Sequence, residues 1–388
     1  MKKVIKDIQS FSNLEKSILI GIAGLFLPFQ YASVVIGALL VYAFFKGNLI
    51  QCVKEQRGAI WLYAFVLLEI IVSLWYKNWI GVLNSFGFLG MALFIAYYRK
   101  ILNPKLFQYI LSEIILLSIL AAGYGLYEFK IVSEKNGYSF FDFKILEKPK
   151  DRINSIFKNA NFYATICEFV IVIALYKMSR AKKIGFRIYY IGIIILNFFM
   201  MLLTGCRTAL LPFLIVFIVF FLLSKEKVYF WFSLSIETIV GILVLLFPNL
   251  VPRFSNFATL NSRFKIWKTS FQAIKMHPLL GEGPQTYGFV YKSLHGHKAP
   301  HAHNIYIDSI LSYGVIGTII GLGYFMSIIL EIKEYYMNEK DRYLFPMILC
   351  FFIIALIHGI MDCTLNFVTT GIIFMMIVNS CSQYKKNI

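Results

Sequence analysis

Charge is scarce in this chain of 388 residues, and acidic residues are scarcer than basic ones. Charged residues make up 15% of the sequence, whereas a soluble domain carries about 25%. Hydrophobic residues make up 59%, and the mean hydropathy is +0.70. Apolar runs of about 20 residues, the length of a helix that crosses a membrane, recur along the chain. The composition therefore predicts a polytopic membrane protein.

Several familiar catalytic motifs are missing. The sequence has no P-loop, no G-x-S-x-G, no H-E-x-x-H and no C-x-x-C. Its long polar loops lack the paired acids that hold a divalent ion, so we expect no metal and no cofactor. The six cysteines are expected to act as small hydrophobic residues, with a Cys206–Cys363 bridge as the alternative. Chemistry outside the apolar runs must therefore use Arg, Lys and His, which suit a phosphate or diphosphate.

Twelve apolar segments are expected to cross the membrane. Their approximate bounds are 14–28, 30–45, 58–75, 79–98, 106–127, 160–178, 187–204, 207–223, 228–247, 303–330, 343–361 and 365–382. The predicted fold is an all-α polytopic membrane protein, with residues 1–388 as a single integral membrane domain. Two long outer loops, 128–159 and 248–302, are too long to be simple connections.

The net charge of +18 does not indicate nucleic-acid binding. The basic residues fall in short clusters between apolar segments, which is the pattern of topology signals. With the N-terminus inside, the inner segments hold 22 of the 38 Lys and Arg residues. The short outer loops hold only Lys77 and Arg207, so we expect the two long loops to lie outside the cytoplasm.

A polar, cationic stretch, 261–317, interrupts the apolar chain and holds five of the six histidines. Its segment 262–276 is expected to form a helix, and Arg263 is expected to face protein, where a guanidinium needs an anionic partner. That partner is either a substrate phosphate or a structural carboxylate. A second arc contains Lys265, Lys268, Gln272 and Lys275. These lysines are expected to contact anionic membrane lipids, and Lys268 is also a candidate for substrate binding.

The histidine-rich loop HGHKAPHAHN follows this helix. A metal site is one interpretation, although the spacing is unusual and only one acid lies nearby. His303 differs from the others because Asn304 follows it, and then nine residues lead to Gly314-x-x-Gly317. If a helix begins near residue 303, His303 shares a stripe with these glycines and Gly321, and small residues let another helix approach closely. The alternative is an incidental histidine beside a packing face.

Further candidates lie outside this stretch. Arg207 is a lone basic residue in a short outer turn, with snorkelling to the interface as the alternative. Arg152, near the end of the first long loop, is a weaker candidate of the same kind. Acids within apolar segments are functional candidates by default, and Asp308, one turn after His303, could orient a neighbouring basic group. The other such acids are scattered singly: Glu69, Glu113, Glu168 and Glu237.

Three segments together resemble the bacterial O-antigen ligase and O-antigen polymerase superfamily. They are LLTGCRTALL, SRFKIWKTSFQAIKMHPLLGEGP and HAHNIYIDSILSYGVIG. The pattern His303-Asn304-x9-Gly314-x-x-Gly317 matches the motif that is used to recognise the ligases. RINSIFKNAN resembles the segment that precedes a middle span in these proteins. The resemblance covers about 150–325 and places the core at 160–325, including the outer loop 248–302.

The resemblance implies a metal-independent glycosyltransferase at the outer face of the bacterial inner membrane. Such proteins take a glycan from undecaprenyl diphosphate. A ligase passes it to the lipid A core, and a polymerase passes it to another lipid-linked repeat unit. The candidates that the resemblance carries over are Arg207 and Arg263 for the diphosphate and His303 as base or positioning group. Further candidates for substrate binding are Arg152, Asn304, Lys268 and Asp308.

Two other functional classes are alternatives. A lipid-linked glycan flippase, or another polysaccharide transporter, would place charges along a central cavity, whereas the charges here cluster at one face. A non-catalytic membrane scaffold would give no reason for motifs on two outer loops.

Overall fold

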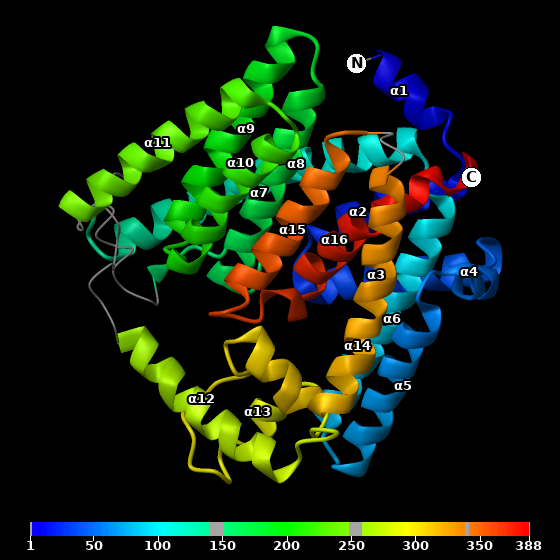
Figure 1. Ribbon diagram of the computed structural model, residues 1–388, viewed down its shortest axis with the longest axis vertical. Helices are drawn as coiled ribbons and strands as arrows, with labels where there is room; N and C mark the ends of the chain where they lie inside the picture. Colours follow the sequence, from blue (N-terminus) through cyan, green and yellow to red (C-terminus); the bar gives the residue numbers. More distant parts are fainter. Residues whose placement is uncertain (1, 140–150, 248–257, 338–340, 388) are drawn as a thin grey trace. The chain divides into compact units, whose positions relative to one another are not determined.

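The computed structural model of the protein describes residues 2–139, 151–247, 258–337 and 341–387 (Figure 1). These residues form helices and no strands, which confirms the all-α prediction. The helices in chain order are α1 Lys2–Gln9, α2 Asn13–Leu25, α3 Phe29–Lys46, α4 Leu49–Glu55, α5 Ala59–Trp75, α6 Trp79–Ile101, α7 Pro104–Lys135, α8 Ala160–Arg180, α9 Ile184–Leu203, η3 Arg207–Ala209, α10 Leu210–Leu223, α11 Lys227–Leu246, α12 Ala258–Met276, α13 Thr286–Val290, α14 Ile305–Met337, α15 Leu344–His358, η5 Thr364–Asn366, α16 Val368–Val378 and η6 Ser380–Asn387.

Each of the twelve predicted apolar segments contains a helix. Six helices in the described residues are long and apolar enough to cross a membrane: α3, α6, α7, α8, α9 and α14. The pair α4 and α5, bent by 111°, would count as a seventh. These helices agree with a multi-pass membrane protein, and the count of twelve spans stays a prediction.

Polar residues cap several of the apolar helices, because the first N–H groups of a helix have no partner within it. At α2, the Ser12 hydroxyl accepts the Glu15 N–H at 3.2 Å, and the Glu15 carboxylate accepts the Ser12 N–H at 2.8 Å. At α6, the Asn78 side chain accepts the Gly81 N–H at 2.9 Å. These local signals explain where the helices begin.

The residues group into two compact units, which are treated separately below. Unit 1 comprises Met1–Glu113, Thr259–Asn338 and Gly371–Ile388, and unit 2 comprises Ile114–Ala258 and Glu339–Thr370. In unit 1, α5 packs against α6 and α14. Buried Arg99 pairs with Glu331 at 2.8 Å and donates to Asn379 at 2.6 Å. This ion pair joins helices α6 and α14 to the end of the chain.

In unit 2, α8 is the central helix. Of the residues in its most apolar stretch, 83% are buried. The helix packs against α9 and α15. The rings of Phe169 and Phe351 stack with their centroids 4.4 Å apart, which joins α8 to α15. A helix covered on nearly all sides can hold polar side chains only where neighbouring helices supply partners.

Both predicted outer loops contain helix. Helix α7 continues to Lys135, into the first loop, and α12 and α13 lie in the second. Residues 140–150 and 248–257 of these loops lie outside the described residues. The predicted helix 262–276 is confirmed as the main part of α12. It packs with α13 and the start of α14 around a small apolar core, whose buried members are Ile266, Ala273, Tyr287, Val290, Ala299, Ala302 and Leu311.

Helix α14 is broken at Gly314, which has φ 60° and ψ −175°. A Cβ atom there would lie 2.3 Å from the Leu279 carbonyl carbon. The turn 278–283 fills the break. Its Pro278 and Leu279 carbonyls accept the N–H groups of residues 315 and 316 at 2.9 and 3.0 Å, and Gly283 N–H donates to the Ser312 carbonyl at 2.9 Å.

The predicted continuous glycine stripe is therefore wrong at Gly314, because a turn, and not another helix, approaches this glycine. The stripe is correct further along α14. Gly317 and Gly321 face Glu69 and Phe65 of α5. Close helix packing thus begins only after the break.

We expect Gly314→Ala to destabilise unit 1 strongly, because alanine would meet both a left-handed φ and the backbone of residue 279. The strain alone is worth about 1–3 kcal/mol. Gly321→Ala is the matched control, since a Cβ there would lie 3.6 Å from Phe65, an ordinary contact. Thermal unfolding of the two purified variants checks this. Equal unfolding temperatures would contradict the importance of the break.

Candidate functional site

In unit 1, the backbone that carries His303 is held on both sides. The Ala302 N–H donates to the Asp308 carboxylate at 2.8 Å, and the Ala302 carbonyl accepts the Trp267 indole N–H at 3.0 Å. Asp308 comes from α14 and Trp267 from α12. The preceding loop is held too, because the Tyr287 hydroxyl donates to the His297 carbonyl at 2.7 Å. His303 is therefore a fixed residue and not part of a loose loop.

Asn304 directly precedes α14 and caps its N-terminal end. Its side-chain oxygen accepts the N–H groups of Tyr306 and Ile307 at 3.0 and 2.9 Å, and its carbonyl accepts the Asp308 N–H at 2.8 Å. This is the geometry of a helix N-cap. The Asn304 side chain thus has a structural role next to His303.

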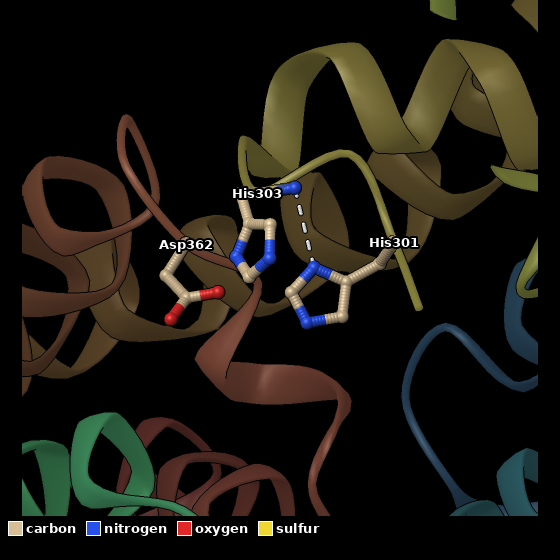
Figure 2. Close-up of side chains that lie close together, drawn as sticks. All are labelled: His301, His303 and Asp362. Carbon is tan, nitrogen blue, oxygen red and sulfur yellow. Dashed lines mark hydrogen bonds between the residues drawn. The ribbon is translucent and has the colours of Figure 1, made fainter. Parts of the chain in front are cut away.

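His303 has a φ of 50°, which is uncommon for a residue other than glycine. Its N–H donates to Nδ1 of buried His301 at 3.2 Å, as drawn in Figure 2. The two imidazole rings lie edge to face with their centroids 4.3 Å apart. Because His301 Nδ1 accepts a hydrogen bond, a neutral His301 carries its proton on Nε2. His303 itself is half-buried.

The exposure of the side chains on α12 separates its basic residues as predicted. Arg263 is half-buried, and its helix face continues into buried Ser270 and Ala273. Lys265, Lys268 and Lys275 are exposed. Two aromatic residues of the same helix, Phe264 and Phe271, are also 60% and 53% exposed.

Lys268 lies in a shallow pocket on this outer face of α12. The pocket is lined by Phe264, Trp267, Lys268, Phe271, Gln272 and Lys275. Aromatic rings beside lysines suit a surface that meets anionic lipid head groups.

Glu282, the acid of the polar stretch before Asp308, is paired with a histidine. It is buried, and its carboxylate lies 3.5 Å from Nε2 of His277, whose Nδ1 contacts the Tyr76 hydroxyl at 3.0 Å. Burial raises the pKa of Glu282, and the nearby His277 opposes this shift. The side-chain amide of Asn78 donates to the Glu282 and Pro284 carbonyls at 3.1 and 3.0 Å. The turn that fills the α14 break is thus fixed to the corner between α5 and α6.

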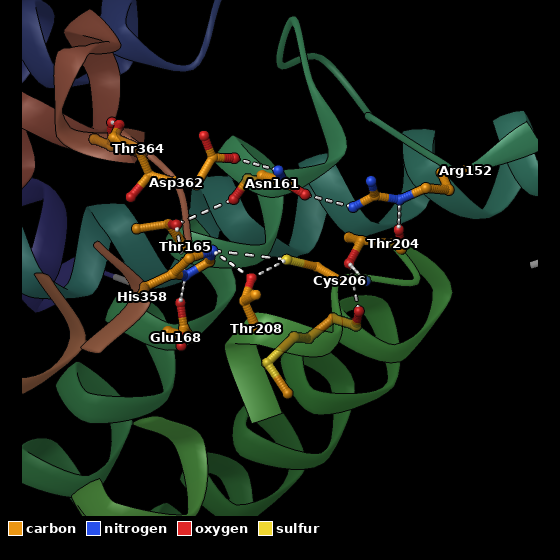
Figure 3. Close-up of polar contacts among 12 residues, drawn as sticks. Arg152, Asn161, Thr165, Glu168, Thr204, Cys206, Thr208, His358, Asp362 and Thr364 are labelled. Atoms are coloured by element: carbon orange, nitrogen blue, oxygen red, sulfur yellow. Dashed lines mark hydrogen bonds and ion pairs between the residues drawn. The ribbon is translucent and has the colours of Figure 1, made fainter. Parts of the chain in front are cut away.

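In unit 2, Arg152 holds the turn that leads to Arg207. The Arg152 guanidinium donates from Nε to the Thr204 carbonyl and from Nη2 to the Asn161 side chain, both at 2.5 Å (Figure 3). Asn161 in turn donates to the Asp362 carboxylate. Arg207 follows this turn, is half-buried and lies within electrostatic range of Arg152. Two like charges held near one another favour the binding of an anion.

A cluster that the sequence did not predict lies beside Arg207. His358 Nδ1 is 2.9 Å from the Glu168 carboxylate, and His358 Nε2 is 3.1 Å from the Thr208 hydroxyl and 3.6 Å from Cys206 Sγ (Figure 3). The sequence suggested that Glu168 is an isolated acid, whereas the structure pairs it with His358. No disulfide joins Cys206 and Cys363, so the alternative of a bridge between them is wrong.

Sequence reasoning missed His358 because its partners are remote in the chain. Glu168 lies 190 residues before it and Thr208 lies 150 residues before it. The available signal was a single histidine at one end of an apolar segment and a single acid within another. Such residues usually pair in a membrane protein, but nothing in the spacing identifies the partner.

The fold and these residues define a helical membrane protein with half-buried cations on short, fixed turns. A model of the O-antigen ligase family matches residues 192–322. This match confirms the resemblance to the O-antigen ligase and polymerase superfamily, and it supports a ligase-like membrane glycosyltransferase. The matched residues include Arg207, Arg263 and His303, whereas Arg152 and His358 lie outside them. A comparison with curated proteins found no match.

We expect Asp308→Ala to loosen the backbone around His303, because the buried Ala302 N–H would lose its acceptor, at a cost of about 1–3 kcal/mol. Asp308→Asn is the matched control, since its side-chain oxygen can still accept that N–H. Hydrogen exchange of the peptide 299–304, followed by mass spectrometry, should be faster in the alanine variant only. The anchoring role would be refuted by equal exchange in both variants.

Proposed function

We propose that this protein is a metal-independent glycosyltransferase of the O-antigen ligase or polymerase type. It would move a glycan from undecaprenyl diphosphate to a sugar hydroxyl at the outer face of a bacterial inner membrane. The observation that carries the proposal is that one family match contains Arg207, Arg263 and His303, three polar residues that are half-buried and not enclosed in the core. The acceptor is either the lipid A core or another lipid-linked repeat unit.

The two arginines are assigned to the diphosphate. When the bond between sugar and diphosphate breaks, negative charge increases on the phosphate oxygens. A guanidinium aimed at these oxygens stabilises the transition state more than the ground state. Arginine suits this role better than lysine, because its planar fork binds two oxygens at once. Arg152 lies close to Arg207, so it adds positive charge near the Arg207 guanidinium.

His303 is assigned to the acceptor hydroxyl. A general base must remove the hydroxyl proton as the sugar oxygen attacks, and histidine is suited to this near neutral pH. Hydrogen bonds at Ala302 and Asn304 anchor the chain on either side of His303. In this assignment His303 either takes the proton or positions the acceptor.

The other four candidates divide into two kinds. Arg152, Asn304 and Asp308 bond to neighbouring backbone or side-chain groups, so we assign them to holding Arg207 and His303 near the substrate. Lys268 is exposed beside aromatic rings, so we assign it to contact with the lipid-linked donor or with membrane lipids. A single exposed lysine contributes little, since its charge is screened by water and salt.

We expect Arg263→Lys and Arg263→Ala both to lower glycan transfer by about 100-fold or more, the effect of losing one donor to a developing oxyanion. Arg207→Lys should behave in the same way. The assay is transfer from undecaprenyl-diphosphate-linked glycan by the purified protein in liposomes. Lys268→Gln and Lys275→Gln, on the exposed arc of the same helix as Arg263, are the controls and should cost far less. Near-normal transfer by Arg263→Lys would show that diffuse positive charge is sufficient.

We expect transfer to survive EDTA, because Arg207 and Arg263 supply positive charge and His303 supplies a base without a metal ion. The measurement compares initial rates before and after chelation, with and without added Mg²⁺ or Mn²⁺. Activity that disappears with EDTA and returns with either ion would show that the reaction depends on a divalent metal.

A further inference from the structure

Unit 2 contains a buried acid–histidine pair that the proposed reaction does not use. Glu168 lies on α8, and His358 is the last residue of α15. His358 is 0% exposed and Glu168 1%. Burying two ionisable groups is costly unless they pair and bond further. The other contacts of the pair indicate what it does.

The Nε2 side of the His358 ring contacts Cys206 and Thr208, the residues directly before and after Arg207. Nε2 lies 3.1 Å from the Thr208 hydroxyl and 3.6 Å from Cys206 Sγ, and these two groups are 3.2 Å apart (Figure 3). Glu168 orients the ring, because its carboxylate accepts a hydrogen bond from Nδ1 at 2.9 Å. The ring thus holds the chain immediately before and after Arg207.

The other end of the same turn is held independently. The Arg152 guanidinium donates to the Thr204 carbonyl at 2.5 Å, and the Thr204 hydroxyl accepts the Cys206 N–H at 3.1 Å. The same hydroxyl donates to the Met201 carbonyl at 2.6 Å, at the end of α9. The turn 204–208 is therefore fixed from both ends, with Arg207 between the two sets of bonds.

We propose that His358, oriented by Glu168, is a positioning residue that holds the turn 204–208 so that the Arg207 guanidinium stays in one orientation. The role of Arg207 in transfer rests on the proposed function, whereas the fixed orientation of Arg207 does not. A flexible arginine would lose conformational freedom each time it bound an anion, whereas a preorganised arginine would not. A displacement of about 1 Å can lower a rate by about 100-fold, so holding this turn affects the reaction without contact to substrate.

The kinetic test is a double-mutant cycle on glycan transfer. We expect Thr208→Val and His358→Ala to lower kcat by about 10- to 100-fold, with a smaller effect on KM. His358→Gln, whose amide can donate or accept a hydrogen bond near the Nε2 position, should recover part of the loss. In an Arg207→Lys background the same changes should add little, because the group that they position is already lost. In an Arg263→Lys background they should multiply with the loss caused by that variant.

A matched control removes a different buried hydrogen bond from the same unit. Tyr176→Phe, at the other end of α8, loses the bond from the Tyr176 hydroxyl to Asp341 at 2.8 Å. This variant should have a small effect that is the same in every background. If Thr208→Val and His358→Ala also multiply equally with Arg207→Lys and Arg263→Lys, the pair only stabilises the fold and the proposal is wrong.

A second readout does not depend on transfer. Phenylglyoxal modifies accessible arginines, and mass spectrometry gives the rate at each residue. We expect Arg207 to react several-fold faster in Thr208→Val and His358→Ala than in the wild type, and Arg263 to react at an unchanged rate. An unchanged rate at Arg207 would overturn the proposal. A wild type without transfer activity, but with the expected change at Arg207, would refute the proposed function and leave the positioning role intact.

Discussion

The hydrogen bonds between the turn 278–283 and the broken helix α14 are the interaction on which the outer part of unit 1 depends. A helix break inside an apolar chain leaves backbone groups that must find partners within the protein. Here the carbonyls of Pro278 and Leu279 and the N–H of Gly283 supply these partners. Because the same turn links α12 to α13, the break connects a membrane helix to the segment that carries Arg263. The start of α14, with His303 before it, therefore has a fixed place relative to α12.

Both units follow a similar rule for polar side chains. In unit 1, buried Arg99 and Glu331 join two long helices, and in unit 2, buried Glu168 and His358 join α8 and α15. Each pair has a further partner, Asn379 in one case and Thr208 in the other. A buried pair that lacked such partners would destabilise the protein, because desolvation can exceed the attraction between two charges. In unit 2 the further partner, Thr208, lies directly beside Arg207. The buried pair in this unit therefore supports a candidate site as well as the packing of two helices.

Much of the helical architecture could be predicted from the sequence, because long apolar runs and a period of 3.6 residues are local signals. The face of α12 that carries Arg263 and the exposed positions of its lysines follow from helix geometry alone. The role of Gly314 could not be predicted in this way, since a glycine in a stripe and a glycine at a break look the same in one sequence. The partnership of Glu168 and His358 was missed for a different reason. It depends on which helices are neighbours, and that is a property of the whole fold.

The family match extends over residues 192–322 and contains the residues assigned to the substrate, together with Asn304 and Asp308, which support His303, but it lacks three residues assigned to the support of Arg207. Arg152, Glu168 and His358 all lie outside it. This division is what chemistry would produce. A group that contacts a diphosphate must be a cation at a defined place in the chain, so it leaves a recognisable pattern. A group that holds a backbone turn needs only one hydrogen bond of the right geometry, and it can come from any helix that passes nearby. Substrate contacts can therefore be inferred from a motif, whereas supporting residues that come from remote parts of the chain have to be found in the structure.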